Sequence, residues 1–144
     1  YYCKKSGITT IADDSGLSIN ALSGAPGIYS ARWAGAKNDF TKAFNKIFKE
    51  LREKEINIAE NKVTAELNCT ISYSAPNTLK ENRFFIGTLT GHITKPYSYD
   101  NGFGYDPIFI PKNHIQSLSE FTSIEKNKIS HRFIATKKLI KALL

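Results

Sequence analysis

Apolar and polar residues alternate without a break from residue 63 to residue 74. A period of two residues is typical of a β-strand with one buried face, commonly paired antiparallel with its neighbour. A second strand is predicted from Arg83 to about Thr94. Two glycines inside it, Gly87 and Gly91, indicate a bulge, a bend or the close approach of another backbone. Its apolar face carries Phe85, Leu89 and Ile93.

Helical spacing appears between Phe40 and about Lys54, where apolar residues recur three and four positions apart. This spacing predicts a helix with one buried face, and Asp39 is its expected N-cap. We expect the aromatic residues of that face to pack in the core. The face comprises Phe40, Ala43, Phe44, Ile47, Phe48 and Leu51.

The C-terminal part of the chain predicts two further helical pieces. The run from Thr122 to Glu125 fits a capping box, which opens a helix. Ser130 is expected to open the second piece. The apolar face of that last helix would consist of Phe133, Ile134, Leu139, Ile140, Leu143 and Leu144.

Candidate chemistry begins with the short apolar run 8–12, which leads into Asp13, Asp14, Ser15 and Gly16. We interpret this stretch as a strand that ends in a tight turn, followed by another strand over 17–21. Two carboxylates and a glycine suit a hard cation such as Mg²⁺ and the phosphates it carries. The alternative is an Asx turn, in which Asp13 or Asp14 only caps the strand end.

A second candidate element is the loop Gly102-Phe103-Gly104-Tyr105-Asp106-Pro107. A phenylalanine between two glycines leaves its ring free to stack on a flat ligand such as a base. Pro107 holds Asp106 extended, which aims its carboxylate at a fixed point. The alternative is a hydrophobic turn that fills the edge of the core.

Basic side chains form the third candidate element. Lys126, His131 and Arg132 can donate hydrogen bonds to carbonyl or phosphate oxygens. The alternative is that they are ordinary charges on a solvated helix surface. Arg32 and Trp33 leave the same choice open, between a basic group near phosphates and a surface or interface pair.

Composition narrows the class of protein. The 144 residues predict a single domain over 1–144, and 41% hydrophobic with 23% charged residues are typical of globular chains. No apolar run is long enough for a membrane span. Cys3 and Cys69 have no metal-ligand spacing, which predicts free thiols in a reducing compartment such as the cytoplasm. The formal net charge of +7 favours an anionic ligand, but the positive residues are spread along the chain and predict no specific nucleic-acid partner.

Four stretches in order resemble the ITPase family of XTP/dITP diphosphatases. They are Ile-Ala-Asp-Asp-Ser-Gly-Leu at 11–17, Gly-Ala-Pro-Gly-Ile-Tyr-Ser-Ala-Arg at 24–32, Gly-Phe-Gly-Tyr-Asp-Pro-Ile-Phe at 102–109 and Ser-His-Arg at 130–132. The resemblance implies an α/β fold with an elongated mixed β-sheet, flanking helices and two lobes around a central cleft. It also implies a homodimer and Mg²⁺-dependent cleavage of ITP, dITP or XTP to the monophosphate and pyrophosphate, which cleanses the nucleotide pool.

The resemblance also assigns roles to residues. Asp14 would be the general base and a metal ligand, with Asp13 beside it as a second metal ligand, and Ser15 would contact substrate. The base-binding loop would comprise Phe103, Gly104, Tyr105 and Asp106. The remaining contacts to the base would come from Lys126, His131 and Arg132.

One part of the family pattern is not in this sequence. The resemblance implies an N-terminal strand, a Ser/Thr-x-Asn-x-x-Lys phosphate loop and a metal-binding glutamate, all of which would precede Tyr1. The chain has no methionine and starts with tyrosine, so we expect an upstream piece. Three hypotheses follow: the larger part of such an enzyme, a truncated inactive remnant that binds nucleotide weakly, or a basic nucleic-acid-binding module.

Overall fold

The computed structural model describes residues 1–76, 83–96 and 102–144. Four strands form one sheet in the order β1-β2-β3-β4, and all three pairings are antiparallel. The predicted strands over 63–74 and 83–94 are confirmed, whereas parallel pairs of the implied mixed sheet do not occur among these four. The strands are β1 (Thr10–Ile19), β2 (Thr64–Ser74), β3 (Arg83–Ile93) and β4 (Phe109–Pro111).

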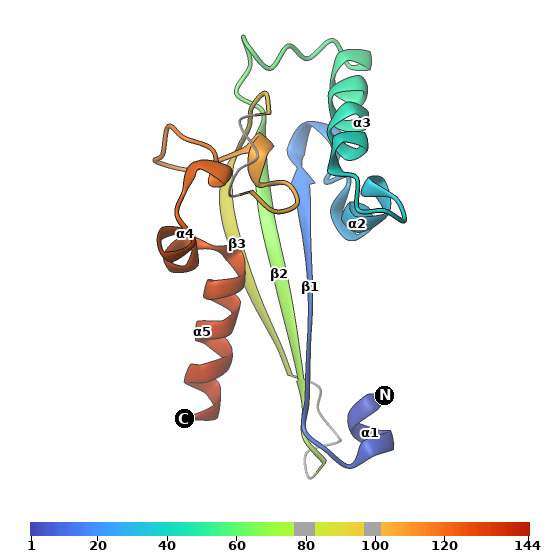
Figure 1. Cartoon of the computed structure of the whole chain (residues 1–144), viewed down its shortest axis with the longest axis vertical. Coiled ribbons are helices and arrows are strands. Elements are labelled where there is room, and N and C mark those ends of the chain that lie inside the picture. The colour runs from blue at the N-terminus through green and yellow to red at the C-terminus, as the bar shows by residue number, and fades with distance from the viewer. Residues whose placement is uncertain (77–82, 97–101) are drawn as a thin grey trace.

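Helices flank the long sheet, which confirms the predicted α/β class. Figure 1 shows α2 and α3 beside β1, and α4 and α5 beside β3. Their bounds are α1 (Tyr2–Ser6), α2 (Ser30–Ala34), α3 (Phe40–Glu53), α4 (Ser123–Ile129) and α5 (His131–Leu143). Short 3-10 turns connect them: η1 (Asn20–Leu22), η2 (Gly27–Tyr29), η4 (Asp106–Ile108) and η5 (Leu118–Glu120).

The main hydrophobic cluster joins α3 to the β1 and β2 strands and to the segment around β4. The amphipathic helix predicted over 40–54 is confirmed, because Ala43, Phe44, Ile47 and Leu51 are buried there. Asp39 stands at the N-cap position, but its side chain accepts no capping hydrogen bond and lies 3.9 Å from the Lys42 ammonium instead. The apolar face of α3 therefore packs against the apolar residues of β1 and β2 in one core.

A second, smaller cluster attaches α5 to the sheet through Ala135 and Leu139, which pack on Cys69 and Ile71. The apolar face predicted for this helix is largely wrong. Four of its six members stay exposed, at 41% for Phe133, 52% for Ile140, 47% for Leu143 and 103% for Leu144.

Small residues explain the difference, because α5 approaches the sheet more closely than large side chains would allow. A Cβ at Gly87 of β3 would collide with the His131 carbonyl and with the Ala135 backbone nitrogen. The close approach predicted from Gly87 and Gly91 is thereby confirmed, since a Cβ at Gly91 would meet the Ile110 carbonyl.

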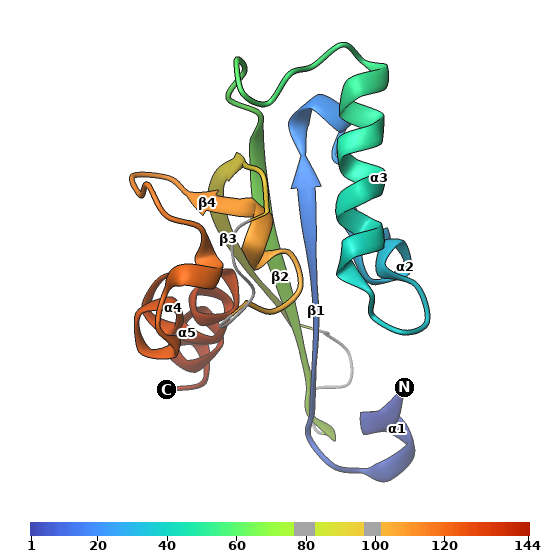
Figure 2. The same cartoon turned by 45° about the horizontal axis from the view of Figure 1, so that its top comes forward.

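The two clusters lie at different levels of the sheet, and Figure 2 shows α3 and the α4–α5 pair on opposite sides of β1. Both cysteines, Cys3 and Cys69, are buried free thiols. Among the described residues, no helix has the length and apolar character needed to cross a membrane.

Candidate functional site

One cavity of about 660 Å³ brings the predicted site residues together. It lies between the middle of β1, the loop before η4 and the starts of α4 and α5. All ten predicted residues line it: Asp13, Asp14, Ser15, Phe103, Gly104, Tyr105, Asp106, Lys126, His131 and Arg132. Arg32 and Trp33 are not among its lining; they contact Tyr29 and Lys46, respectively, in cation–π pairs on the helical side.

The carboxylates lie in the middle of a strand rather than at its end. β1 runs without a break from Thr10 to Ile19, so the predicted turn at 13–16, its division into two strands and the Asx alternative are wrong. The acidic stretch has the composition of a turn, but continuous pairing of ten residues with β2 decides its conformation.

This geometry separates the two aspartates, since successive side chains of a strand point to opposite faces. Asp13 pairs with Ile71, on the face that α5 covers, whereas Asp14 pairs with Thr70 on the other face. Both still border the cavity because β1 is an edge strand of the sheet.

Gly16 is required by close packing and not by a turn. A Cβ there would lie 2.5 Å from the Gly27 carbonyl oxygen and 2.9 Å from the Ser30 Oγ. Ser30 Oγ accepts a 2.9 Å hydrogen bond from the Leu17 N–H and donates a 2.6 Å bond to the Gly27 carbonyl. The start of α2 is thus fastened directly to the carboxylate strand.

The aromatic loop divides its two rings between solvent and core. The Phe103 side chain is 76% exposed, whereas Tyr105 is 5% exposed and packs edge-on against Phe40. The Tyr105 hydroxyl donates a 2.8 Å hydrogen bond to the Ser30 carbonyl, and burial raises the pKa of Tyr105 to about 12. Phe103 can therefore contact a ligand, while Tyr105 anchors the loop. The alternative prediction, a hydrophobic turn that fills the edge of the core, thus holds for Tyr105 but not for Phe103.

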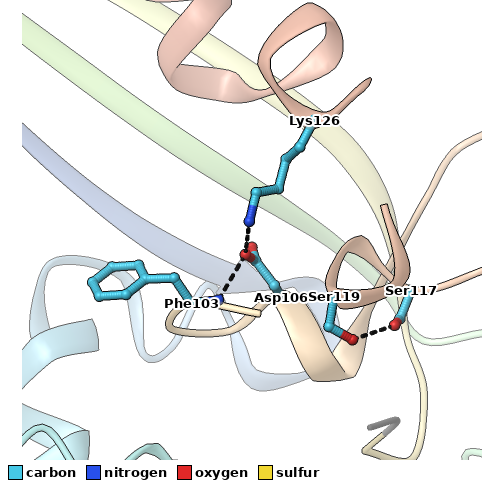
Figure 3. A network of polar contacts seen from close by, with 5 residues as sticks. All are labelled: Phe103, Asp106, Ser117, Ser119 and Lys126. Carbon is cyan, nitrogen blue, oxygen red and sulfur yellow. Dashed lines mark hydrogen bonds and ion pairs between the residues drawn. The ribbon is translucent and has the colours of Figure 1, made fainter. Parts of the chain in front are cut away.

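Asp106 fixes this loop from within, as Figure 3 shows. Its Oδ2 accepts hydrogen bonds from the Phe103 N–H at 3.0 Å and from the Lys126 Nζ at 2.8 Å. Only 8% of Asp106 is exposed, so the ion pair with Lys126 compensates a nearly buried charge.

The η5 turn supports the same loop from behind. A Cβ at Gly102 would come within 2.8 Å of the Ser119 Cβ, and the Ser119 and Ser117 hydroxyl oxygens lie 2.7 Å apart (Figure 3). The Ser117 N–H donates to the Glu120 carboxylate at 2.6 Å, which closes the capping box of that turn.

Two capped helix starts deliver the basic residues to the cavity. Thr122 and Glu125 form the predicted capping box of α4, and the Ser130 Oγ accepts from the Phe133 N–H at the start of α5. Both predictions are confirmed. Lys126 lies one turn into α4, and His131 and Arg132 are the first two residues of α5.

The imidazole of His131 is largely withdrawn from solvent. Burial, together with the Arg132 charge, lowers its pKa to about 4, although the Asp106 and Asp13 carboxylates oppose this shift. His131 is therefore neutral near pH 7. Its Nδ1 is buried and has no hydrogen-bond partner among the described residues.

A salt bridge crosses the cavity from α5 to β1. The Arg132 Nε and Nη2 both approach the Asp13 Oδ2, at 3.0 and 2.9 Å, and Nη2 also lies 3.5 Å from the Ser15 Oγ. No described side chain pairs with the Asp14 carboxylate.

The fit to a Mg²⁺ ion is limited to one carboxylate. Within residues 1–76, 83–96 and 102–144, no three His, Cys, Asp or Glu side chains gather into a potential metal site. Asp13 is engaged by Arg132, which leaves Asp14. Mg²⁺ in nucleotide sites often uses one or two carboxylates and takes its other ligands from substrate phosphates and water, and Asp14 fits such a role.

Nothing in the sequence indicated that Ser30 shapes the site. Ser30 is buried and joins β1 to the Tyr105 loop, and it lies in one of the motifs quoted above, but a serine carries no chemical signal of this function. At Gly87 the sequence predicted a close approach but not its partner, which is the first turn of α5.

Comparisons with known proteins point to one family. A profile described as the Ham1 family matches residues 1–142. The chain is 44% identical over all its 144 residues to a dITP/XTP pyrophosphatase of Zymomonas mobilis, covering 66% of that protein. It is 45% identical over 133 residues, 92% of the chain, to a Bacillus subtilis protein of the same name, covering 64% of it.

Solved structures show the same similarity. The Staphylococcus aureus Ham1 protein matches with a TM-score of 0.85 and 38% identity, over 97% of this chain and 69% of that one. A HAM1 protein from Coxiella burnetii matches with a TM-score of 0.87 and 34% identity, over 98% and 70%. The chain thus spans about two thirds of the length of the curated relatives it matches.

Proposed function

Because the chain belongs to the Ham1 family, we propose that it carries the nucleotide site of a pyrophosphatase that hydrolyses deaminated purine nucleoside triphosphates. The substrates would be dITP, ITP and XTP, and the products the monophosphate and pyrophosphate. The observation that carries this proposal is the single cavity shared by a free carboxylate, an exposed aromatic ring and three basic side chains. Relatives named dITP/XTP pyrophosphatase support it.

Asp14 is the residue we assign to the chemical step. Its exposed carboxylate can accept a proton from an attacking water, whose oxygen bonds to phosphorus as the bridging P–O bond between the α- and β-phosphates breaks. Pyrophosphate carries the electron pair of the broken bond away. A Mg²⁺ ion held by Asp14 and the phosphates would neutralise charge on the leaving group.

The other lining residues would hold the nucleotide. Phe103 offers an exposed face for stacking the base, and Gly104, whose φ is +65°, lets the backbone turn beside it. Ser15 has a hydroxyl facing the cavity side of β1. Asp106 would act through Lys126, whose ammonium it fixes.

Discrimination between bases would follow from the donors at this end. Lys126, His131 and Arg132 suit the 6-oxo group of hypoxanthine and xanthine. The 6-amino group of adenine cannot accept these bonds, so these donors would gain no acceptor on the base, which weakens binding. We also propose a homodimer and a cytoplasmic location; light scattering of the purified protein tests the first.

Pyrophosphate release from dITP in the presence of Mg²⁺ tests the proposal directly. Wild-type chain should release pyrophosphate, and Asp14→Asn should abolish release. Asp39→Asn is the matched control, because Asp39 is a partly exposed aspartate that does not line the cavity. Equal release by the wild type and Asp14→Asn would exclude the role of Asp14, and nucleotide binding without release would favour the inactive-remnant hypothesis.

A further inference from the structure

The two neighbouring aspartates of β1 have different surroundings. Asp13 is bound by Arg132, whereas Asp14 is exposed on the opposite face of the strand. We propose that Asp13 is a positioning residue that orients the Arg132 guanidinium toward the nucleobase, and that Asp14 alone serves the phosphate end. This inference rests on the proposed function and refines it.

The contact geometry indicates orientation rather than simple attraction. Two nitrogens on one edge of the guanidinium, Nε and Nη2, share the Asp13 Oδ2. Nη2 is also close to the Ser15 Oγ. A guanidinium has five N–H donors in a rigid plane, so fixing one edge fixes the direction of the rest. No described residue accepts a hydrogen bond from Nη1, which leaves its donors available to a ligand.

The pair contributes little to folding. Its side chains are 56% exposed for Arg132 and 43% exposed for Asp13, and exposed ion pairs stabilise proteins only slightly. The α5 helix is held to the sheet by Ala135 and Leu139 instead. Breaking the pair should therefore change what Arg132 does without unfolding the helix.

Arg132 lines the cavity together with the loop residues that the proposed function assigns to the base. The His131 imidazole next to it feels the charges of Arg132, Asp106 and Asp13, so these groups surround one ring. Asp106 in turn holds Lys126 and the Phe103 backbone. Arg132 thus lines the same cavity as the exposed Phe103 ring, whereas Asp14 lies on the face of β1 opposite to Asp13.

Engagement by Arg132 also makes Asp13 a poor metal ligand. A metal at Oδ2 would have to displace two charge-assisted hydrogen bonds, and a metal at Oδ1 would share the carboxylate with a guanidinium that already compensates its charge. The competing possibility, that Asp13 and Asp14 bind Mg²⁺ together, predicts that both respond to metal concentration.

Calorimetric titration of inosine monophosphate without metal separates these possibilities. We expect Asp13→Asn and Arg132→Gln each to weaken binding about tenfold, and the double variant to be no weaker than either. Arg132→Lys should also bind weakly, because it keeps the charge but loses the planar fork. Additive losses in the double variant, or wild-type affinity of Asp13→Asn, would overturn the inference.

Hydrolysis assays supply the second arm. Asp13→Asn should lower the ratio of kcat/KM for ITP over ATP and leave the half-saturating Mg²⁺ concentration unchanged. A raised Mg²⁺ requirement for Asp13→Asn would assign it to the metal, and an equal loss on ITP and ATP would place Arg132 on a phosphate oxygen; either result contradicts the proposal. If the wild type neither binds inosine monophosphate nor releases pyrophosphate, the proposed function itself fails.

Discussion

At Gly87, a single added methyl group should lower both the stability of the fold and the activity of the site. It lies in β3 beneath the first turn of α5, and a Cβ there would lie 2.5 Å from the Ala135 nitrogen and still closer to the His131 carbonyl. Ordinary contacts between such atoms begin near 3.4 Å, so Gly87→Ala must push the helix outward by at least about 1 Å. His131 and Arg132, which begin that helix, would move with it.

Two magnitudes follow from this displacement. Overpacking of a close contact costs about 1–3 kcal/mol, which lowers the folded-to-unfolded ratio by roughly 5- to 150-fold. A misplacement of about 1 Å at a catalytic site can cost about 100-fold in rate. We therefore expect kcat/KM on ITP to fall by about 10- to 100-fold in the folded protein.

Gly91→Ala is the matched control on the same strand. Its Cβ would collide with the Ile110 carbonyl and lie 2.6 Å from the Phe109 ring, away from the nucleotide cavity. Urea unfolding followed by circular dichroism measures stability. Pyrophosphate release, measured without urea where both variants are folded, measures activity. Full activity of Gly87→Ala, or an equal loss in Gly91→Ala, would refute the reasoning.

Three further substitutions test individual contacts. Ser30→Ala should lower the free energy of unfolding by about 1–3 kcal/mol, because the buried Leu17 N–H loses its acceptor. An unchanged midpoint of urea denaturation would contradict this prediction. Thr122→Ala should cost about 1 kcal/mol by removing the cap that receives the Glu125 N–H, which a melting curve would show. The pKa of His131 is about 4 in the folded protein, against an ordinary value of 6.5, so on acidification the unfolded state binds this proton before the folded state does. The free energy of unfolding should therefore decrease as the pH falls from 6.5 to 4, and His131→Gln should show a smaller decrease.

Periodicity predicted the regular elements because their burial is one-sided. The alternation along β2 and the apolar stripe of α3 each mark the face that is buried on folding, and the structure buries these same faces. The helix caps were predictable for a similar reason, since Thr122 and Ser130 satisfy backbone donors within one turn of their own sequence.

The parts that depend on long-range packing were not predictable in the same way. Gly16 resembled a turn residue, whereas its role is to let the Gly27 carbonyl approach β1 from another segment. The buried side of α5 was hidden because Ala135 is small and sits against Gly87. Members of the candidate site could be proposed from residue type and resemblance, but the division of Asp13 and Asp14 between two faces required the register with β2.

The outer margin of β1 has a practical consequence for handling the protein. On the edge of β1 that faces away from β2, the N–H groups of Leu17 and Ile19 donate to the Ser30 Oγ and the Ala25 carbonyl. Because backbone direction alternates along a strand, the N–H groups of Ile11, Asp13 and Ser15 point toward this same edge. No acceptor for those three occurs in the part of the chain that the structure describes. Such a row is a template onto which a foreign strand can add. Concentrated samples should therefore be watched for self-association, which salt would promote by screening the repulsion among molecules of net charge +7.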